Sequence, residues 1–237
     1  MNIFEAAEKG DAARVKEILD QDPTLVNAKG GYDKTPLHWA AEKNHKELAA
    51  LLVAARAEVE TETTWGMTPL AWAANMGSND VAEILLARGA RCTMWAAAGL
   101  GMLDRVKSFW ESPATLKPGA GQSRSRRDDE GRWGKAPPPE SYPELISDAF
   151  YIAGRNGHIE VMAFLLERGA DINCRGFFGG TGLHWAAING HKAAVRWLLD
   201  HGADAALKDT EFDATPHGWA LETSQTEIAA LLQSCGS

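Results

Sequence analysis

The sequence has few cysteines, and none of them has the spacing of a metal site or a disulfide framework. Cys92, Cys174 and Cys235 are the only three in 237 residues, and they lie far apart. Disulfide frameworks use an even number of cysteines, and zinc sites use closely spaced Cys or His ligands. The sequence therefore predicts free thiols in a reducing, cytoplasmic environment, and it predicts no metal site.

Long apolar runs and an excess of positive charge are also lacking. No run of 18 apolar residues occurs, so no transmembrane helix is predicted. Lys and Arg number 24 against 32 Asp and Glu, which gives a net charge of -8. This balance disfavours a global electrostatic interaction with nucleic acid or an anionic membrane. The opening stretch MNIFEAAEKGDAARVKEIL predicts an amphipathic helix and does not resemble a signal peptide.

Sequence motifs of catalysis are missing as well. There is no His-Glu-x-x-His and no Gly-x-Ser-x-Gly motif, and the stretch GAGQSRS lacks the Lys-Ser/Thr ending of a phosphate-binding loop. The sequence therefore predicts no catalytic residue and no cofactor. It leaves enzymatic activity open but favours its absence.

What the sequence does contain is an internal repeat. TPLHWAA begins at Thr35, TPLAWAA at Thr68, TGLHWAA at Thr181 and TPHGWAL at Thr215. After each, a Gly or polar break precedes a second apolar run with helical spacing. Three further segments show the same pair of runs without the Thr-Pro start. Seven helix pairs are therefore predicted.

The residue types within one repeat explain why it forms a helix pair. Thr followed by Pro supplies an N-cap and a first helical residue, and paired alanines let a neighbouring repeat approach closely. Gly89, Gly169 and Gly202 follow the second helix, where a left-handed cap is needed, although Arg56 occupies the same place. One pair cannot bury its own apolar face, so the pairs must stack.

These motifs resemble the ankyrin repeat family. The resemblance rests on TPLHWAAEKNHKELAALL, EVMAFLLERGADIN and TGLHWAAINGHKAAVRWLLDHGAD, and the later segments are similar to ankyrin proteins of bacteria. It implies an all-α fold with short β-hairpin fingers: an ankyrin-repeat α-solenoid of about seven helix-turn-helix units with an insertion in the middle. It also implies a concave face made of fingers and first helices.

The predicted organisation is a single domain, residues 1–237, with an irregular middle. Trp72 and Trp95 are only 23 residues apart, which predicts the loss of one finger, whereas Trp95 and Ile152 are 57 apart. The insert, residues 117–143, is rich in Gly, Pro and Arg and is predicted to be a long loop and not a packed element. It is either a tolerated surface insertion or a segment that folds over the concave face and completes a site. The predicted units are approximately 1–32, 33–65, 66–90, 91–116, 144–177, 178–210 and 211–237.

An aromatic residue stands three positions before each opening Thr. The four are Tyr32, Trp65, Phe178 and Phe212. The resemblance places this position near a finger tip, where partners are usually met, and aromatic side chains are common anchors of interfaces. The alternative is that each ring packs on the adjacent finger and stiffens the row.

Tryptophan and histidine recur inside the repeats, and we predict structural roles for both. The tryptophans should fill the space between neighbouring first helices. His38 and His184 should bond back to the opening Thr, and the histidines after the helix break should bridge to the next repeat. The tryptophans are Trp39, Trp72, Trp95, Trp185 and Trp219, and the bridging histidines are His45, His158 and His191.

Two functions remain open. The first is a monomeric, cytoplasmic module that binds another protein on its concave face. Its predicted partner-binding residues are Tyr32, Trp65, Phe178, Phe212, Lys43, Met76, Arg155, Asn156 and Asn189. The alternative is a small-molecule binder or enzyme with a Trp-lined pocket between the middle repeats and the insert. Its predicted pocket residues are Trp95, Trp133, Asp148 and Arg155.

Overall fold

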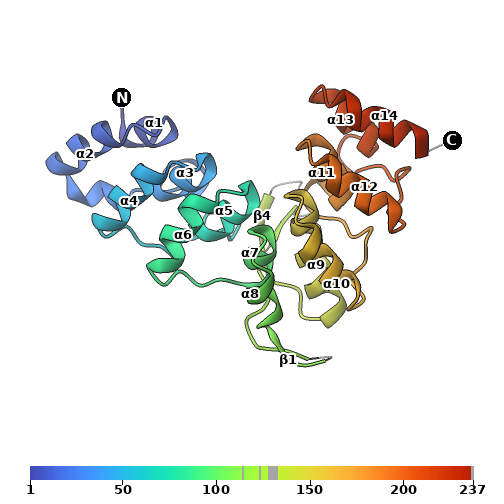
Figure 1. Cartoon of the computed structure of the whole chain (residues 1–237). Coiled ribbons are helices and arrows are strands. Elements are labelled where there is room, and N and C mark those ends of the chain that lie inside the picture. Colours follow the sequence, from blue (N-terminus) through green and yellow to red (C-terminus); the bar gives the residue numbers. More distant parts are fainter. Residues whose placement is uncertain (114, 123, 128–132, 236–237) are drawn as a thin grey trace. The chain divides into compact units, whose positions relative to one another are not determined.

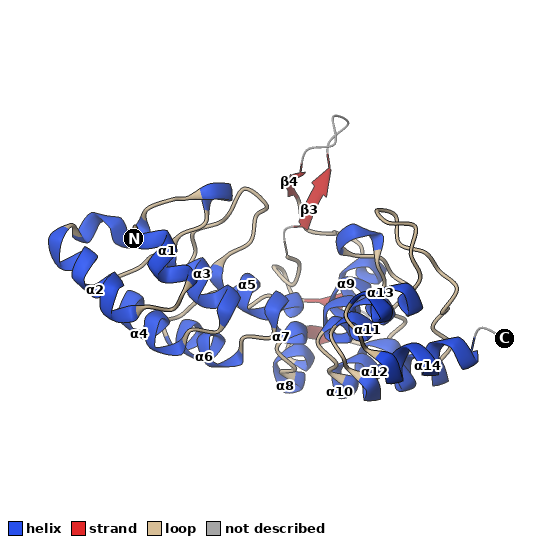
Figure 2. Ribbon diagram, turned by 90° about the horizontal axis from the view of Figure 1, so that it is seen from above, coloured by secondary structure: helices blue, strands red, loops and turns tan. Residues whose placement is uncertain are grey.

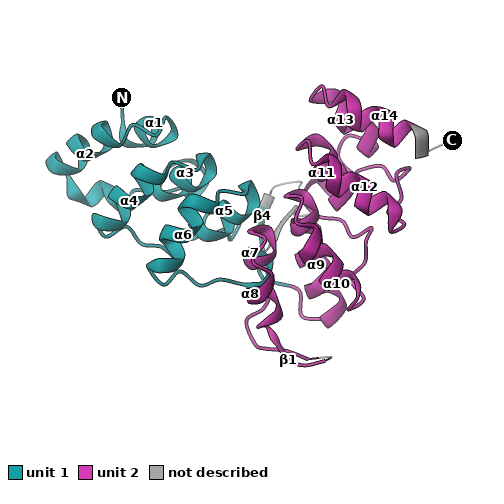
Figure 3. Cartoon of the chain, viewed as in Figure 1, with its two compact units in different colours: residues 1–96, 122–138 teal, residues 97–121, 139–237 magenta. Residues whose placement is uncertain are grey.

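The chain folds into two compact units (Figure 3). Unit 1 comprises Met1–Ala96 and Gln122–Pro138, and unit 2 comprises Ala97–Gly121 and Pro139–Ser237. The computed structural model describes residues 1–113, 115–122, 124–127 and 133–235. The chain passes between the units more than once, and each unit is described by itself below.

Unit 1 contains three helix pairs in two rows. The first helices α1, α3 and α5 contact one another in turn, and so do the second helices α2, α4 and α6 (Figures 1 and 2). The α-helices are α1 (Ile3–Glu8), α2 (Ala12–Gln21), α3 (Pro36–Lys43), α4 (Lys46–Ala54), α5 (Pro69–Met76) and α6 (Asn79–Ala87). Short 3₁₀ turns, η1 (Pro23–Asn27) and η2 (Gly31–Asp33), lie between α2 and α3.

Unit 2 repeats this arrangement. Its first helices α9, α11 and α13 contact one another in turn, and α12 contacts α14. The elements are α8 (Leu103–Lys107), α9 (Tyr142–Arg155), α10 (Ile159–Leu166), η3 (Phe177–Gly179), α11 (Gly182–Ile188), α12 (Lys192–Asp200), α13 (Pro216–Glu222) and α14 (Thr226–Cys235). Helix α7 (Met94–Gly99) contains the boundary between the units. Only six residues separate α6 from α7, so the predicted loss of a finger is confirmed.

The insert contains one antiparallel hairpin, so the prediction of a loop without packed elements is wrong (Figure 2), and a second hairpin lies just before the insert. In unit 2, β1 (Trp110–Ser112) pairs with β2 (Thr115–Leu116). In unit 1, β3 (Arg124–Arg127) pairs with β4 (Trp133–Ala136). Strand pairing satisfies the backbone here without a continuous apolar pattern, and the Gly- and Arg-rich composition hides it.

The two hairpins are anchored by side chains at their edges. Trp110 lies edge-on to Phe164 of α10 with 5.2 Å between ring centroids, and its indole N–H donates to the Tyr142 hydroxyl at 3.2 Å. In unit 1, Lys135 pairs with Glu62, and the Gln122 amide bonds to Thr93 and to the Gly66 carbonyl. Residues 122–138 of the insert belong to unit 1, and its two ends belong to unit 2.

Histidines join consecutive repeats. His38 Nδ1 lies 3.1 Å from the Thr35 amide and 2.9 Å from its hydroxyl, while Nε2 lies 3.0 Å from the carbonyl of Met67 in the next repeat. His184 does the same between Thr181 and Ala214. The predicted bond back to the opening Thr is therefore confirmed for both.

The histidines after the helix break point the other way from the prediction. His45 Nε2 lies 3.1 Å from the Glu8 carbonyl, and His158 Nε2 lies 3.0 Å from the Gly99 carbonyl, so both contact the preceding repeat. A left-handed glycine there leaves room for the ring: a Cβ on Gly10 would lie 2.6 Å from His45. The predicted bridge to the next repeat is wrong, because the space that the glycine leaves for the ring lies in the preceding repeat.

Four of the second helices, α4, α6, α10 and α12, are followed by a residue in the left-handed region. Gly89, Gly169 and Gly202 have φ of 87°, 89° and 90°, and Arg56 stands in the same place with φ 67°. The following amide bonds back across the turn in each case, for example from Ala57 to Leu52 at 2.9 Å. An L-residue with a side chain is disfavoured here because its Cβ crowds the carbonyl oxygen.

We expect the substitution Arg56→Gly to raise the free energy of unfolding by about 1 kcal/mol, the approximate cost of a left-handed L-residue. Chemical denaturation of the variant and the parent chain measures it. Arg56→Ala is the control, because it removes the guanidinium and keeps the Cβ, and it should leave stability nearly unchanged. A glycine variant no more stable than the alanine variant would contradict the prediction.

Candidate functional site

In unit 1 the two finger-tip aromatics lie against each other. Tyr32, at 63% exposure, has its ring centroid 4.7 Å from that of Trp65. Trp65 in turn lies edge-on to Trp72 of α5 at 5.8 Å. The Tyr32 carbonyl accepts a hydrogen bond from the Thr64 amide at 3.0 Å, which joins the two fingers. Trp65 thus packs on its neighbours, as the alternative of a stiffened row predicts, while the Tyr32 ring is open to solvent, and the role of the tips toward a partner stays a prediction.

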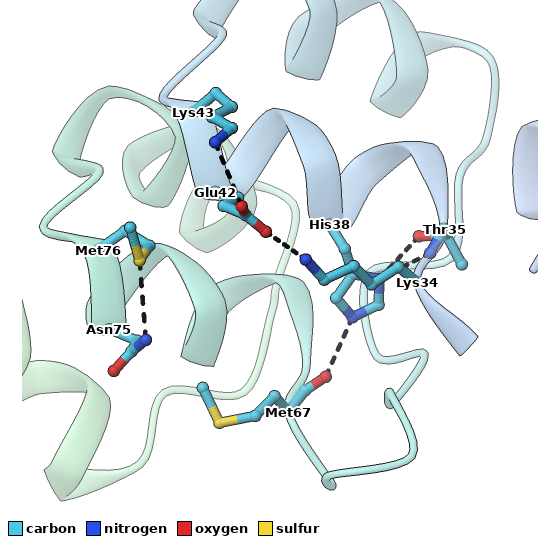
Figure 4. A network of polar contacts seen from close by, with 8 residues as sticks. All are labelled: Lys34, Thr35, His38, Glu42, Lys43, Met67, Asn75 and Met76. Atoms are coloured by element: carbon cyan, nitrogen blue, oxygen red, sulfur yellow. Dashed lines mark hydrogen bonds and ion pairs between the residues drawn. The ribbon is translucent and has the colours of Figure 1, made fainter. Parts of the chain in front are cut away.

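A buried cation lies under this pair. The Lys34 ammonium is 4.2 Å from the Trp39 ring centroid and 4.6 Å from that of Trp72, and it pairs with Glu42 (Figure 4). Lys43, predicted as a partner contact, reaches the other Glu42 oxygen at 3.4 Å. The Lys34 ammonium thus joins two indole rings and the Glu42 carboxylate, and these contacts hold the surface of the first helices in place.

The end of α5 presents an apolar side chain beside this network. Met76 is 46% exposed, and its sulfur accepts a contact from the Asn75 amide at 3.7 Å (Figure 4). A flexible, polarisable thioether adapts to varied contact surfaces. Among the predicted residues of unit 1, Tyr32, Trp65, Lys43 and Met76 thus all have side chains that reach the surface.

Unit 2 carries the same construction with different residues. Phe178 lies 5.8 Å from Phe212 and 6.2 Å from Trp185, and Phe212 lies 6.5 Å from Trp219. Phe212 is 63% exposed. The Phe178 carbonyl accepts from the Thr210 amide at 3.2 Å, which matches the link between the fingers of unit 1.

In unit 2 the cation that lies on a first-helix tryptophan comes from a helix and not from the finger. The Arg155 guanidinium carbon lies 3.5 Å from the Trp185 ring centroid, and Arg155 ends helix α9 of the preceding repeat. Burial lowers the pKa of this guanidinium, and the neighbouring Tyr151 acts against that shift. Where unit 1 has Lys34, unit 2 has Gly180, and a Cβ there would lie 2.9 Å from Trp219. This glycine lets Trp185 and Trp219 meet edge-on at 5.0 Å.

The first tip residue of each unit has an unusual backbone. Tyr32 has φ 58° and ψ 27°, and Phe178 has φ 58° and ψ 15°. Bulky L-residues rarely adopt this left-handed conformation, which costs about 1–2 kcal/mol. Such outliers concentrate at functional positions. Among the described residues, this outlier falls on one aromatic residue in each unit, at the same place in the finger.

The bases of three fingers are closed by different acceptors. In the last repeat, the Asp209 carboxylate accepts from the amides of Glu211, Phe212 and Ala214 and from the Trp219 indole N–H at 2.8 Å. Burial acts to raise the pKa of Asp209, but these donors outweigh it and hold the pKa below its usual range. In the third repeat the Thr63 hydroxyl accepts from the amides of Trp65 and Met67.

In the sixth repeat a tyrosine of the preceding helix closes the finger. Gly176 stands at the place of Asp209, and a Cβ there would lie 2.1 Å from the Tyr151 ring. The Tyr151 hydroxyl accepts from the Phe177 amide at 3.1 Å, and burial raises the pKa of this phenol. The Trp72 and Trp185 indole N–H groups are buried and have no acceptor within the part of the chain that the structure describes.

Two predicted contacts have structural partners. The Asn156 amide donates to the Gly99 carbonyl at 2.7 Å, and the Asn189 amide donates to the Arg155 carbonyl at 3.0 Å. Thr223 does the same toward Ile188 at 3.0 Å. These side chains therefore form a ladder between consecutive first helices, and their role toward a partner stays a prediction.

The residues of the alternative pocket are divided between the units. Trp95 is buried in α7 within unit 1, whereas Asp148 and Arg155 are buried in α9 of unit 2. The Trp133 side chain lies outside the described part. Buried tryptophans on the first helices match the predicted filling role, since Trp72, Trp95 and Trp219 are all buried.

A separate hollow of about 680 Å³ lies beside the β1–β2 hairpin of unit 2. It is lined in part by Lys107, Glu111, Glu167 and Arg168, which leaves its charge balanced. The ring of Phe164 is already covered by the Arg168 guanidinium at 3.5 Å. Within the described residues, no group of three His, Cys, Asp or Glu side chains could hold a metal ion, and no helix is long and apolar enough to span a membrane.

The family model for ankyrin repeats (3 copies) matches residues 3–96 and 149–237, and the chain belongs to the ankyrin repeat family. It is 41% identical over 61 residues to mouse Ankyrin repeat and SAM domain-containing protein 6, and 36% identical over 59 residues to the Arabidopsis thaliana serine/threonine-protein kinase VIK. These segments are 26% and 25% of this chain but only 7% and 14% of those relatives. The structure of the human ASB11 ankyrin repeat domain is similar at a TM-score of 0.48 and 21% identity, covering 98% of this chain and 97% of that one. Ankyrin repeats are in general protein–protein interaction modules.

Proposed function

We propose that this chain binds another protein through its finger-tip aromatics, Tyr32 and Trp65 in unit 1 and Phe178 and Phe212 in unit 2. The observation that carries the proposal is the exposed tip ring of each unit, Tyr32 or Phe212, paired with a second ring over first-helix tryptophans. A ring held this way loses little conformational entropy when a partner covers it, which favours aromatic side chains as anchors.

The backbone at the tips supports this proposal. Tyr32 and Phe178 both adopt a costly left-handed conformation, although glycine would adopt it without strain. Lys43 and Met76 add a polar and an apolar contact next to the pair in unit 1. In each unit the first-helix tryptophans under the tip rings form a platform, and Arg155 supports the platform of unit 2. We place the binding function in the cytoplasm on a monomeric chain.

Alanine at all four tips should abolish partner capture. The four substitutions remove the exposed rings but leave the helix pairs and their His38 and His184 links intact. The measurement is recovery of partners on the immobilised chain, with circular dichroism to show that the helices persist. Leu221→Ala is the matched control, because Leu221 is 54% exposed on α13 but is not a tip residue. Equal recovery by the parent and the quadruple variant, both folded, argues against the proposal.

The alternative of a small-molecule binder or enzyme has no specific observation in its favour. Its four residues do not share one unit, and the described hollow in unit 2 involves none of them.

A further inference from the structure

The finger tips of the two units match each other in construction. In each, a left-handed aromatic residue (Tyr32 or Phe178) accepts an amide hydrogen bond from the next finger, whose own aromatic residue (Trp65 or Phe212) contacts it. In each, a ring of the pair contacts a tryptophan of a first helix, and a buried cation lies on a tryptophan of that platform.

The platforms reach this common form by different routes. The cation is Lys34, from the finger, in unit 1, and Arg155, from the preceding helix, in unit 2. The finger base is closed by the Thr63 hydroxyl in unit 1, and by the Tyr151 hydroxyl and the Asp209 carboxylate in unit 2. The two tip surfaces are thus alike although different residues support them. Simple copying of the repeat does not account for this likeness.

Several of the charges beside the tips are neutralised within the chain. Lys34 pairs with Glu42, Lys135 with Glu62, and Lys208 with Asp213 at 2.7 Å. The Asp209 carboxylate is satisfied by four N–H donors. A ligand with many charges would have to break these pairs or leave its own charges uncompensated, so an apolar ligand fits these surfaces better.

We infer that the chain has two equivalent docking surfaces, one per unit, each for a short peptide segment that presents an aromatic or large aliphatic side chain and little charge. This rests on the proposed function and specifies its partner and stoichiometry. Each surface takes one such segment, so one chain binds two segments.

The probe for the test is a twelve-residue peptide selected from a random phage library for binding to the whole chain. We expect its consensus to contain an aromatic or large aliphatic residue and no excess of charge. Isothermal titration should give two equivalent sites per chain. The dissociation constant should change less than about twofold between 0.05 and 0.5 M NaCl, because screening acts on charge pairs and not on apolar contacts.

Variants separate the two surfaces. Tyr32→Gly and Phe178→Gly remove a ring while accepting the left-handed backbone, so they should not harm folding. Each should reduce the stoichiometry from two to one, and the double variant should abolish binding. Tyr32→Phe keeps the ring and should keep two sites.

The possible outcomes are distinguishable. A single site lost entirely through changes in one unit overturns the inference of two surfaces but leaves the proposed function standing. Binding that none of the tip variants affects, or a library that yields no binder, overturns both. A charged consensus with steep salt dependence overturns the apolar partner class.

Discussion

Replacing Asp209 by alanine is expected to destabilise unit 2 by about 3 kcal/mol. Four donors lose a charged acceptor in this variant. Glu211 and Phe212 are exposed and their amides regain water, whereas Ala214 is half-buried and the Trp219 indole is buried. A buried or half-buried donor that loses a charged acceptor costs roughly 1.5 kcal/mol, and two such donors make up the expected value.

Chemical denaturation followed by tryptophan fluorescence measures this loss, and hydrogen exchange of the α13 amides shows whether it is local to unit 2. Asp209→Asn keeps one carbonyl oxygen and should cost about half as much, because it can still accept from one side of the turn. Asp213→Asn is the matched control. Its side chain pairs with Lys208 at the surface, and exposed pairs contribute about 0–1 kcal/mol. Equal stability of the Asp209→Ala and Asp213→Asn variants would contradict the account of the finger base.

The repeats could be predicted from the sequence because their signals are local. Thr35 before Pro36 begins a helix, His38 reaches back to Thr35, and both features recur at fixed spacing. The helix end at Arg56 could also be predicted, since the same place holds glycine in three other repeats, but the sequence left open whether Arg56 adopts the left-handed backbone or ends the helix differently. These features depend on neighbours within a few residues, so the pattern of residue types is sufficient to reveal them.

The insert and the platforms under the tips could not be predicted in the same way. Cross-strand pairing in β3–β4 needs no apolar alternation, so its composition predicted a loop. The contacts of Arg155 with Trp185 and of Tyr151 with Phe177 join residues 30 and 26 positions apart in sequence. Gly176 was a signal for the contact of Tyr151 with Phe177, because a glycine there leaves space that a neighbouring ring can fill. One sequence alone does not show which ring fills it.

The aromatic tips are an intermediate case. Their place three residues before the opening Thr is visible in the sequence, but the left-handed backbone of Tyr32 and Phe178 is not. Neither residue type favours that conformation, so local preference predicts the opposite. In both fingers the carbonyl of this residue accepts a hydrogen bond from the next finger. That contact is long-range, so the sequence pattern does not show it.

Acidification is expected to weaken unit 1 through His38. Burial is the main cause that lowers the pKa of His38 from 6.5 to about 4, since the charged imidazole would lose its hydration; nearby Lys34 and Lys29 lower it further. In the unfolded chain the group protonates near pH 6.5. The unfolded state therefore binds a proton between pH 6.5 and about 4 that the folded state does not, and stability falls as the pH falls through this window.

The expected loss is about 3 kcal/mol between pH 7 and pH 4, from roughly 1.4 kcal/mol for each unit of pKa difference. Acid affects other groups of the chain as well, so the free energy of unfolding of the parent chain is compared with that of His38→Gln at each pH. The glutamine variant should be less stable at pH 7, because it loses the paired contacts to Thr35 and Met67, but it should lose less stability on acidification. The difference between the two chains should thus shrink as the pH falls. Parallel pH profiles would show that the imidazole of His38 is not held neutral by its burial between repeats.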